Sequence, residues 1–368
     1  MRNHLTWLVV AVLGCGSSGG GNALVGGSGG SIVTGGSGGS TGGTAGFTGG
    51  SGGTTFDAGP DVGATGGAAD GGGGAPDANT GGAGGTFQKL VWRNEPGPGY
   101  NRAIGGSGEN DVWVVGDLGE IWNSKGDGVW TRRPADTMDR MNGVWGTGPN
   151  DVYVAPNINY ILHWKGMWVK ETSGIPLAVV FHQFWGAAPD DVYVAGGGLM
   201  HTTGNGAWTA VNIPPGTNGI GNVHGYGKDV WGLGLSGLVI HSKGDGKWLS
   251  EDPGLMSNPL GIWAASADEV YVLGSSEVFH RRSDGKWTKE AIALDAATGG
   301  LSSIWGSGPK DIYVTASRGF FFHSNGDGAW SREAITTNPN VPIASVWGTS
   351  AQNVYILAGV GVLHGKPQ

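Results

Sequence analysis

The chain has 368 residues, of which 77 are glycine, and most of the glycine lies before residue 87. The formal net charge is -8 and no long run of Lys or Arg occurs, which argues against nucleic acid as a partner. The single cysteine, Cys15, excludes an intramolecular disulfide. The roughly 280 residues that follow the glycine-rich part are enough for one large all-β domain, which we expect to be a monomer.

The first 15 residues have the composition of an export signal. A short basic start is followed by a mostly apolar run of nine residues, 5–13, which is too short to span a bilayer but suits a secretory signal. Residues 12–15, Val-Leu-Gly-Cys, resemble the lipobox of bacterial lipoproteins. The resemblance implies cleavage before Cys15 and its lipidation, palmitate included. In lipoproteins of this kind, an Asp directly after the cysteine usually keeps the protein in the inner membrane. Gly16 stands at that position here, so the resemblance favours the outer membrane, on its periplasmic or cell-surface side. An ordinary signal peptide with an incidental cysteine is the alternative.

Residues 16–86 are expected to form a disordered tether. They consist of Gly, Ser, Thr and Ala with scattered Asp and Pro, so they offer little apolar surface to offset the entropy of ordering. About 70 such residues have a root-mean-square span of roughly 45 Å. The tether could therefore hold a folded domain away from a membrane.

A short sequence unit recurs seven times after the tether. Each unit has short runs of β-branched and aromatic residues between turn residues, which is typical of four short strands. One Asp position of the unit recurs every 38 to 43 residues, and a closing Trp recurs with it. These positions are Asp111, Asp151, Asp191, Asp229, Asp268, Asp311 and Asn353, and Trp92, Trp130, Trp168, Trp208, Trp248, Trp287 and Trp330. A period near 40 residues with four strands per unit predicts an all-β, seven-bladed β-propeller.

The two series of residues are out of phase at the ends of the domain. Trp92 precedes the first Asp, whereas no Trp follows Asn353. We therefore expect a propeller over residues 87–368 in which the N-terminal strand, residues 87–93, completes the last blade. Such closure removes an exposed sheet edge and joins the two ends of the ring.

The repeat resembles that of a known group of propellers. The pattern W-G-x-G-P-x-D-V-Y-V followed by H-x-x-G-D-G-x-W is similar to the β-propeller repeats of secreted bacterial lipoproteins, broadly akin to sialidase-type Asp-box (BNR) propellers. The resemblance covers residues 87–368 and implies the architecture. Asp327 and Trp330 are three residues apart here, whereas the two residues of an Asp-box are five apart. The resemblance therefore implies no glycosidase chemistry, and fold alone does not define function.

The polar and aromatic residues that repeat are interpreted as scaffold. Six histidines share one repeat position, where they would point outward around a ring rather than converge on a metal, and we expect them to stabilise the Asp-Gly hairpins. They are His163, His201, His241, His280, His323 and His364. The repeated Asp suits turn capping. Fourteen of the 17 tryptophans occupy repeat positions and are expected to pack between blades. We predict no metal site, cofactor or catalytic residue.

What does not repeat is the place to look for a binding site. The connections between successive units vary widely, and variable loops on a rigid scaffold commonly carry function. The residues just before each inner strand should line the mouth of the central channel. The candidate ligand-binding residues are Arg102, Arg140, Asn142, His182, Gln183, Asn222, His224, Ser302, Ser303 and Ser345.

The sequence favours a membrane-anchored, non-catalytic propeller that binds a protein or glycan through its variable loops. A carbohydrate-active hydrolase or lyase with its site in the channel is one alternative. It would need convergent carboxylates, and the inner-strand segments offer Asp139 and otherwise mostly neutral or basic groups. An outer-membrane assembly factor is another alternative.

Overall fold

The computed structural model describes residues 89–97, 99, 101–176, 179–334, 341–359 and 361–367. The expected signal (residues 1–15, with Cys15) and the expected tether (residues 16–86) lie outside the described residues and stay predictions. Within the described ranges, no helix is long and apolar enough to cross a membrane.

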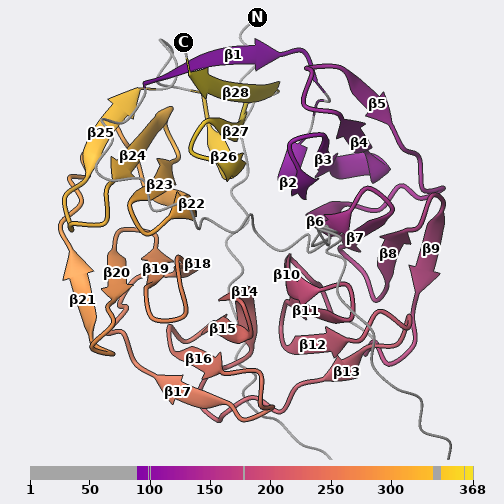
Figure 1. Cartoon of the computed structure of the whole chain (residues 1–368), viewed down its shortest axis with the longest axis horizontal. Helices are drawn as coiled ribbons and strands as arrows, with labels where there is room; N and C mark the ends of the chain where they lie inside the picture. Colours follow the sequence, from indigo (N-terminus) through magenta and orange to yellow (C-terminus); the bar gives the residue numbers. More distant parts are fainter. Residues whose placement is uncertain are drawn as a thin grey trace, which may run out of the picture. The chain divides into compact units, whose positions relative to one another are not determined.

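The described residues form seven antiparallel sheets of four strands, placed around a central axis (Figure 1). Each sheet is one blade, and the blades are numbered here along the chain with strands given from the axis outward. Blade 1 contains β2 (Asn101–Gly108), β3 (Asp111–Gly116), β4 (Ile121–Ser124) and β5 (Trp130–Arg132), with a short 3-10 turn η1 (Asp117–Gly119). Blade 2 contains β6 (Met141–Gly148), β7 (Asp151–Pro156), β8 (Ile161–Trp164) and β9 (Trp168–Glu171). Blade 3 contains β10 (Gln183–Ala188), β11 (Asp191–Ala195), β12 (Leu199–Thr202) and β13 (Thr209–Ala210).

The remaining blades repeat the same order and confirm the predicted seven-bladed β-propeller. Blade 4 contains β14 (Ile220–Tyr226), β15 (Asp229–Gly234), β16 (Val239–Ser242) and β17 (Leu249–Glu251). Blade 5 contains β18 (Pro259–Ala264), β19 (Val270–Gly274), β20 (Val278–Arg281) and β21 (Trp287–Glu290). Blade 6 contains β22 (Leu301–Gly308), β23 (Asp311–Ala316), β24 (Phe320–Ser324) and β25 (Ser331–Ala334). Blade 7 contains β26 (Ile343–Ser350), β27 (Asn353–Ala358), β28 (Gly361–Pro367) and β1 (Leu90–Glu95).

Blade 7 closes the ring by joining the two ends of the domain. Its outer strand β1 pairs antiparallel with β28, with Trp92 opposite Gly365 and Glu95 opposite Val362. Figure 1 shows β1, drawn in indigo, beside the yellow strand β28. The predicted closure by an N-terminal strand is confirmed, although the strand runs over Leu90–Glu95 rather than 87–93.

The blades pack through an aromatic position on the inner strands, called here the indole position. It is occupied by Gly105, Trp145, Trp185, His224, Trp263, Trp305 and Trp347. Each of the five indoles lies beside a Tyr of its own blade, with ring centroids 5.9–6.4 Å apart. Four of them also reach a glycine of the next blade: a Cβ added at Gly186, Gly225, Gly306 or Gly348 would lie 2.5–2.6 Å from the indole of the preceding blade. The glycines therefore allow neighbouring blades to approach closely.

A second link between blades joins the repeated His, Asp and Trp through a glutamate. In blade 2, His163 places Nε2 2.6 Å from Asp151 and Nδ1 2.7 Å from Glu171. The same Glu171 accepts a 2.8 Å hydrogen bond from Trp208 Nε1 of blade 3. The arrangement recurs from blade 5 to blade 6 and from blade 7 to blade 1, through Glu269, His280, Glu290 and Trp330, and through Asn353, His364, Glu95 and Trp130. The repeat is therefore a cross-blade hydrogen-bond network.

This network corrects two expectations from the sequence. The repeated histidines were expected to stabilise the Asp-Gly hairpins, but they bind the carboxylate or amide at the start of the second strand instead. In blade 5 this carboxylate is Glu269 rather than Asp268, because Glu269 directly precedes β19 and lies 2.5 Å from His280 Nε2. The structural interpretation of the histidines fits these contacts, whereas the partner and one position were wrong.

The two faces of the ring carry different kinds of connection. The turns after the first and third strands lie together, since a Cβ added at Gly126 would meet the backbone oxygen of Glu109 at 2.2 Å. The turns after the second strand lie beside the connections to the next blade, as the 2.9 Å hydrogen bond from Gly119 N to Asp139 O shows. We call the latter side the variable face, because it carries the connections that differ most between blades.

Candidate functional site

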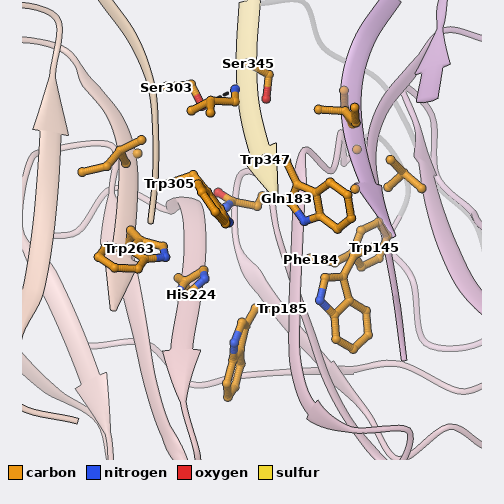
Figure 2. A pocket seen from close by; sticks show the side chains of 18 of the residues that line it. Trp145, Gln183, Phe184, Trp185, His224, Trp263, Ser303, Trp305, Ser345 and Trp347 are labelled. Atoms are coloured by element: carbon orange, nitrogen blue, oxygen red, sulfur yellow. Dashed lines mark hydrogen bonds between the residues drawn. The ribbon is translucent and has the colours of Figure 1, made fainter. Parts of the chain in front are cut away.

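A pocket of about 650 Å³ lies on the axis of the ring and is lined by the inner strands of all seven blades. Its lining runs from the starts of these strands, at the variable face, to Gly108, Glu109 and Thr349 at their ends. The inner strands place equivalent residues at the same depth because they share one sequence pattern and one register. Figure 2 shows the resulting level of aromatic side chains, with His224 near Trp185 and Trp263.

Nine of the ten predicted site residues line this pocket, and one does not. The nine are Arg102, Asn142, His182, Gln183, Asn222, His224, Ser302, Ser303 and Ser345. Arg140 is absent from the lining and is half exposed, with Nε 3.4 Å from Asp117. Asp117 also lies 2.5 Å from Arg102 Nε, so this carboxylate holds both guanidinium groups at the edge of the mouth.

Some of the lining residues also join neighbouring blades. Asn142 Nδ2 donates to the backbone oxygen of Phe181 at 3.3 Å, which links blade 2 to blade 3. Ser303 Oγ accepts from the backbone N–H of Val346 at 3.4 Å, which links blade 6 to blade 7. These polar side chains are therefore scaffold and pocket wall at once.

Three other lining residues have side chains that are available to a ligand. Among the described residues, the side chains of Gln183, Asn222 and Ser345 form no hydrogen bond with the protein. Each lies two residues before the indole position, in blades 3, 4 and 7, so the three lie at a similar depth along the axis of the ring. Their amide and hydroxyl groups can both donate and accept. The mouth thus offers neutral polar groups from three separate blades.

The two histidines of the lining are neutral at physiological pH. Desolvation lowers the pKa of His182 below its ordinary value. Burial lowers the pKa of His224 to about 4. The backbone N–H of Ala264 donates to His224 Nδ1 at 3.1 Å, so Nδ1 must be the unprotonated nitrogen and Nε2 carries the hydrogen.

The five indoles that line the pocket were interpreted from the sequence as packing residues alone. The structure gives them both roles, since each packs between blades and also forms part of the pocket wall. The sequence signal for the second role was their place in the innermost strand. Trp185, Trp263 and Trp305 are nevertheless more than nine-tenths buried, so their ring faces are not open to a ligand.

Carboxylates are scarce in the pocket. Among the described residues that line it, Glu109 is the one carboxylate, at the end away from the variable face. Asp139, noted from the sequence, lies outside the lining and accepts a 2.7 Å hydrogen bond from the Tyr160 hydroxyl. The hydrogen bonds from Tyr160 and Thr137 lower the pKa of Asp139. No group of three or more His, Cys, Asp or Glu side chains that could hold a metal occurs in the described part of the chain.

The His163 network predicts a defined pH dependence of stability. Burial opposes the charged imidazole, but the hydrogen bonds to Asp151 and Glu171 outweigh it and raise the pKa of His163. A raised pKa stabilises the fold below the unfolded value, about 6.5, and this contribution is lost as the pH rises through the folded pKa. We expect His163→Gln to lower the free energy of unfolding by about 3 kcal/mol near pH 6 and by less at pH 9, measured by urea denaturation.

The matched control is His201, whose side chain is 28% exposed and contacts one carboxylate, Asp191. His201→Gln should cost less than about 1 kcal/mol at every pH, because this pair is open to solvent in part and ion pairs near the surface contribute little. A cost of His163→Gln that grows between pH 6 and pH 9 would contradict the assignment.

Comparisons with known proteins identify the fold class, a β-propeller, and no narrower family. The chain matches no known family model and no curated protein sequence. It is similar to the structure of streptogramin B lyase, with a TM-score of 0.67 and 12% identity over 77% of this chain and 100% of that one. Virginiamycin B lyase from Staphylococcus aureus gives a TM-score of 0.66 and 15% identity over 76% of this chain and 99% of that one.

A third similar structure is YCF48 bound to D1 peptide, with a TM-score of 0.61 and 12% identity over 77% of this chain and 96% of that one. The group thus includes enzymes and a peptide-bound propeller. At these identities the similarity establishes the fold alone.

Proposed function

We propose that this protein is a non-catalytic propeller that binds a segment of polypeptide at the mouth of its axial pocket, on the variable face. The observation that carries the proposal is the set of neutral polar side chains of Gln183, Asn222 and Ser345, which line the mouth and have no partner among the described residues. Peptide groups need donors and acceptors of this neutral kind. A pocket with such groups on several blades can hold an extended segment without burying a charge.

The aromatic geometry favours a peptide over a glycan. Sugars bind aromatic residues through open ring faces, but the pocket indoles have one face against a tyrosine, as in Trp305 and Tyr313, whose centroids are 5.9 Å apart. The far rings of four of them lie against a glycine of the next blade. The structural similarity to a propeller bound to a peptide is consistent with this choice. An outer-membrane assembly factor is one form that such a peptide-binding protein could take.

The enzyme alternative has weaker support. Glycoside hydrolysis commonly uses two carboxyl groups that face each other across the scissile bond. Of the described residues that line the pocket, Glu109 alone is a carboxylate. A lyase of the kind seen among the structural neighbours is tested by incubating the purified propeller with polysaccharides and cyclic peptides and looking for cleavage products. Turnover by the wild type would overturn the non-catalytic proposal.

The binding proposal is tested with the double variant Gln183→Ala/Asn222→Ala. Peptide and glycan arrays probed with residues 87–368 should select a peptide, and its Kd should then be measured by calorimetry. We expect the variant to bind at least about 5-fold more weakly, because each of the two neutral hydrogen bonds contributes about 0.5–1.5 kcal/mol. Asn150→Ala, an exposed change in a turn of the opposite face, should leave the Kd unchanged. Unaltered affinity of the double variant, or selection of glycans alone, would contradict the proposal.

We further propose that the protein is exported and lipid-anchored through Cys15, with residues 16–86 as a spacer. The support is the lipobox-like run at 12–15 and the absence of any other cysteine. Cys15→Ala is expected to move the protein from the membrane pellet to the soluble fraction, and labelling with an alkyne-tagged palmitate should disappear. Ser17→Ala is the matched control and should remain in the pellet. Retention of Cys15→Ala in the membrane would exclude the lipid anchor.

A further inference from the structure

His224 departs from the repeat at the indole position. Five blades carry Trp there, and blade 1 carries Gly105. The exception in blade 1 is explained by packing, because a Cβ added at Gly105 would lie 2.4 Å from the backbone oxygen of Val144. No such close approach accounts for the imidazole in blade 4, which lies in the wall of the pocket (Figure 2).

A second residue changes together with His224. When a blade has Trp at the indole position, the next blade has glycine where the indole touches it. Trp263 and Gly306 are one such pair, and a Cβ added at Gly306 would lie 2.5 Å from the indole. In blade 5, the blade next to His224, the residue equivalent to that glycine is Ala264. An imidazole is shorter than an indole and leaves room for this methyl group.

The imidazole has a fixed orientation and one unused hydrogen. Ala264 N donates to Nδ1 at 3.1 Å, which makes Nε2–H the donor. Nε2 has no hydrogen-bond partner among the described residues, although the side chain is only partly exposed. A rigid, half-buried donor that faces a pocket is a binding element for an acceptor group of a ligand.

The surroundings of His224 select an uncharged acceptor. Asn222 lies two residues earlier on β14 and therefore on the same side of the strand. Gln183 lies at the level of Asn222 on the neighbouring strand β10. Of the charged residues in the lining, Arg102 is already held by Asp117, and Glu109 lies at the far end of the pocket. A low pKa keeps His224 neutral, so an anionic ligand gains no ion pair there.

We propose that Nε2–H of His224, with Asn222 and Gln183, forms a subsite inside the channel that binds an uncharged amide carbonyl of the polypeptide. The proposal rests on the proposed peptide-binding function and adds the class of group that enters the channel. It defines a ligand with a neutral stretch, such as Asn, Gln or Gly, at the point of deepest insertion.

The structure provides a variant that removes the Nε2–H donor and keeps the scaffold. His224→Trp together with Ala264→Gly restores the pair found between the other blades, so it should unfold at the wild-type temperature. The probe is an array of acetylated, amidated hexapeptides in two matched sets, one uncharged and one with Asp or Glu at the centre. We expect the wild type to prefer the uncharged set and the double variant to bind its best peptide 3- to 10-fold more weakly, because it loses the Nε2–H donor. His224→Ala removes the Nε2–H donor together with the acceptor of the Ala264 N–H, and should also weaken binding 3- to 10-fold, consistent with the range for one neutral hydrogen bond to the ligand.

A direct readout is the 15N spectrum of the His224 imidazole. Nε2–H should persist from pH 5.5 to pH 8 and shift when the best uncharged peptide is added. Unchanged peptide affinity in both variants would overturn the subsite while leaving the peptide-binding function intact. A preference for the acidic set would also overturn it. Failure of any peptide to bind the wild type would overturn both.

Discussion

Deletion of β1 (Leu90–Glu95) is expected to lower the melting temperature by more than 10 °C and to cause aggregation. The strand supplies the outer edge of blade 7, and without it β28 exposes an unpaired edge that invites association between chains. The deletion also removes Glu95, which lies 2.6 Å from His364 Nδ1 and accepts from Trp130 Nε1 at 3.1 Å. Loss of one partner from a buried pair of this kind costs about 3–5 kcal/mol. Circular dichroism and light scattering of residues 87–368 with and without the strand measure the effect.

Two controls separate closure from mere truncation. Removal of residues 20–80, within the expected tether, should leave the melting temperature within about 1 °C, because that segment has little apolar surface to bury. Glu95→Ala should reproduce much of the loss, whereas Lys286→Ala, which breaks the exposed pair with Asp284, should cost less than about 1 kcal/mol. A strand deletion that melts like the wild type would show that the ring does not need its closing strand.

Gly306→Ala is expected to lower the free energy of unfolding by about 1–3 kcal/mol, the range for overpacking a close-packed interior. The added Cβ would lie 2.5 Å from Trp263 and 2.7 Å from the backbone oxygen of Asp311. The indole is held from the other side by Tyr271, so it cannot move away freely. Urea denaturation, monitored by tryptophan fluorescence, measures the difference.

The repeat itself suggests how to relieve this clash. Trp263→His/Gly306→Ala imitates the natural pair His224 and Ala264, so the alanine should cost less in that background than in the wild type. Gly148→Ala is the matched control, because its Cβ would meet no atom within 4 Å and its φ is not positive. It should change the stability by less than about 0.5 kcal/mol. Equal costs of Gly306→Ala in both backgrounds would show that the indole is not the obstacle.

The sequence predicted the scaffold well because each blade is specified by residues that are close together in the chain. Short β-branched runs, Asp-Gly turns and a closing Trp specify four strands without reference to the rest of the chain. The out-of-phase ends, Trp92 and Asn353, then predicted the closing strand. The glutamate of the cross-blade network was missed, although W-x-x-E in Trp168 to Glu171 repeats in five of the seven units. Its role depends on a Trp of the next blade, which spacing within one unit does not reveal.

The candidate site was predicted in outline and refined by the structure. Nine of ten chosen residues line the pocket because they lie on an inner strand or directly before it, but Arg140 lies just outside and is turned to Asp117. The sequence grouped His224 with these residues without distinguishing it. Its contact with Ala264 in the next blade is what fixes its tautomer.

The sequence by itself determined the number of blades, the order of their strands and the way the ring closes, since these follow from a local pattern with a constant period. The tertiary structure alone decided which side chains meet across blades and on the axis. It paired the indoles with glycine and His224 with Ala264, and it put Glu269 in place of Asp268. The contacts between blades join residues about 40 positions apart, and their geometry depends on how closely two blades approach, which no single repeat encodes.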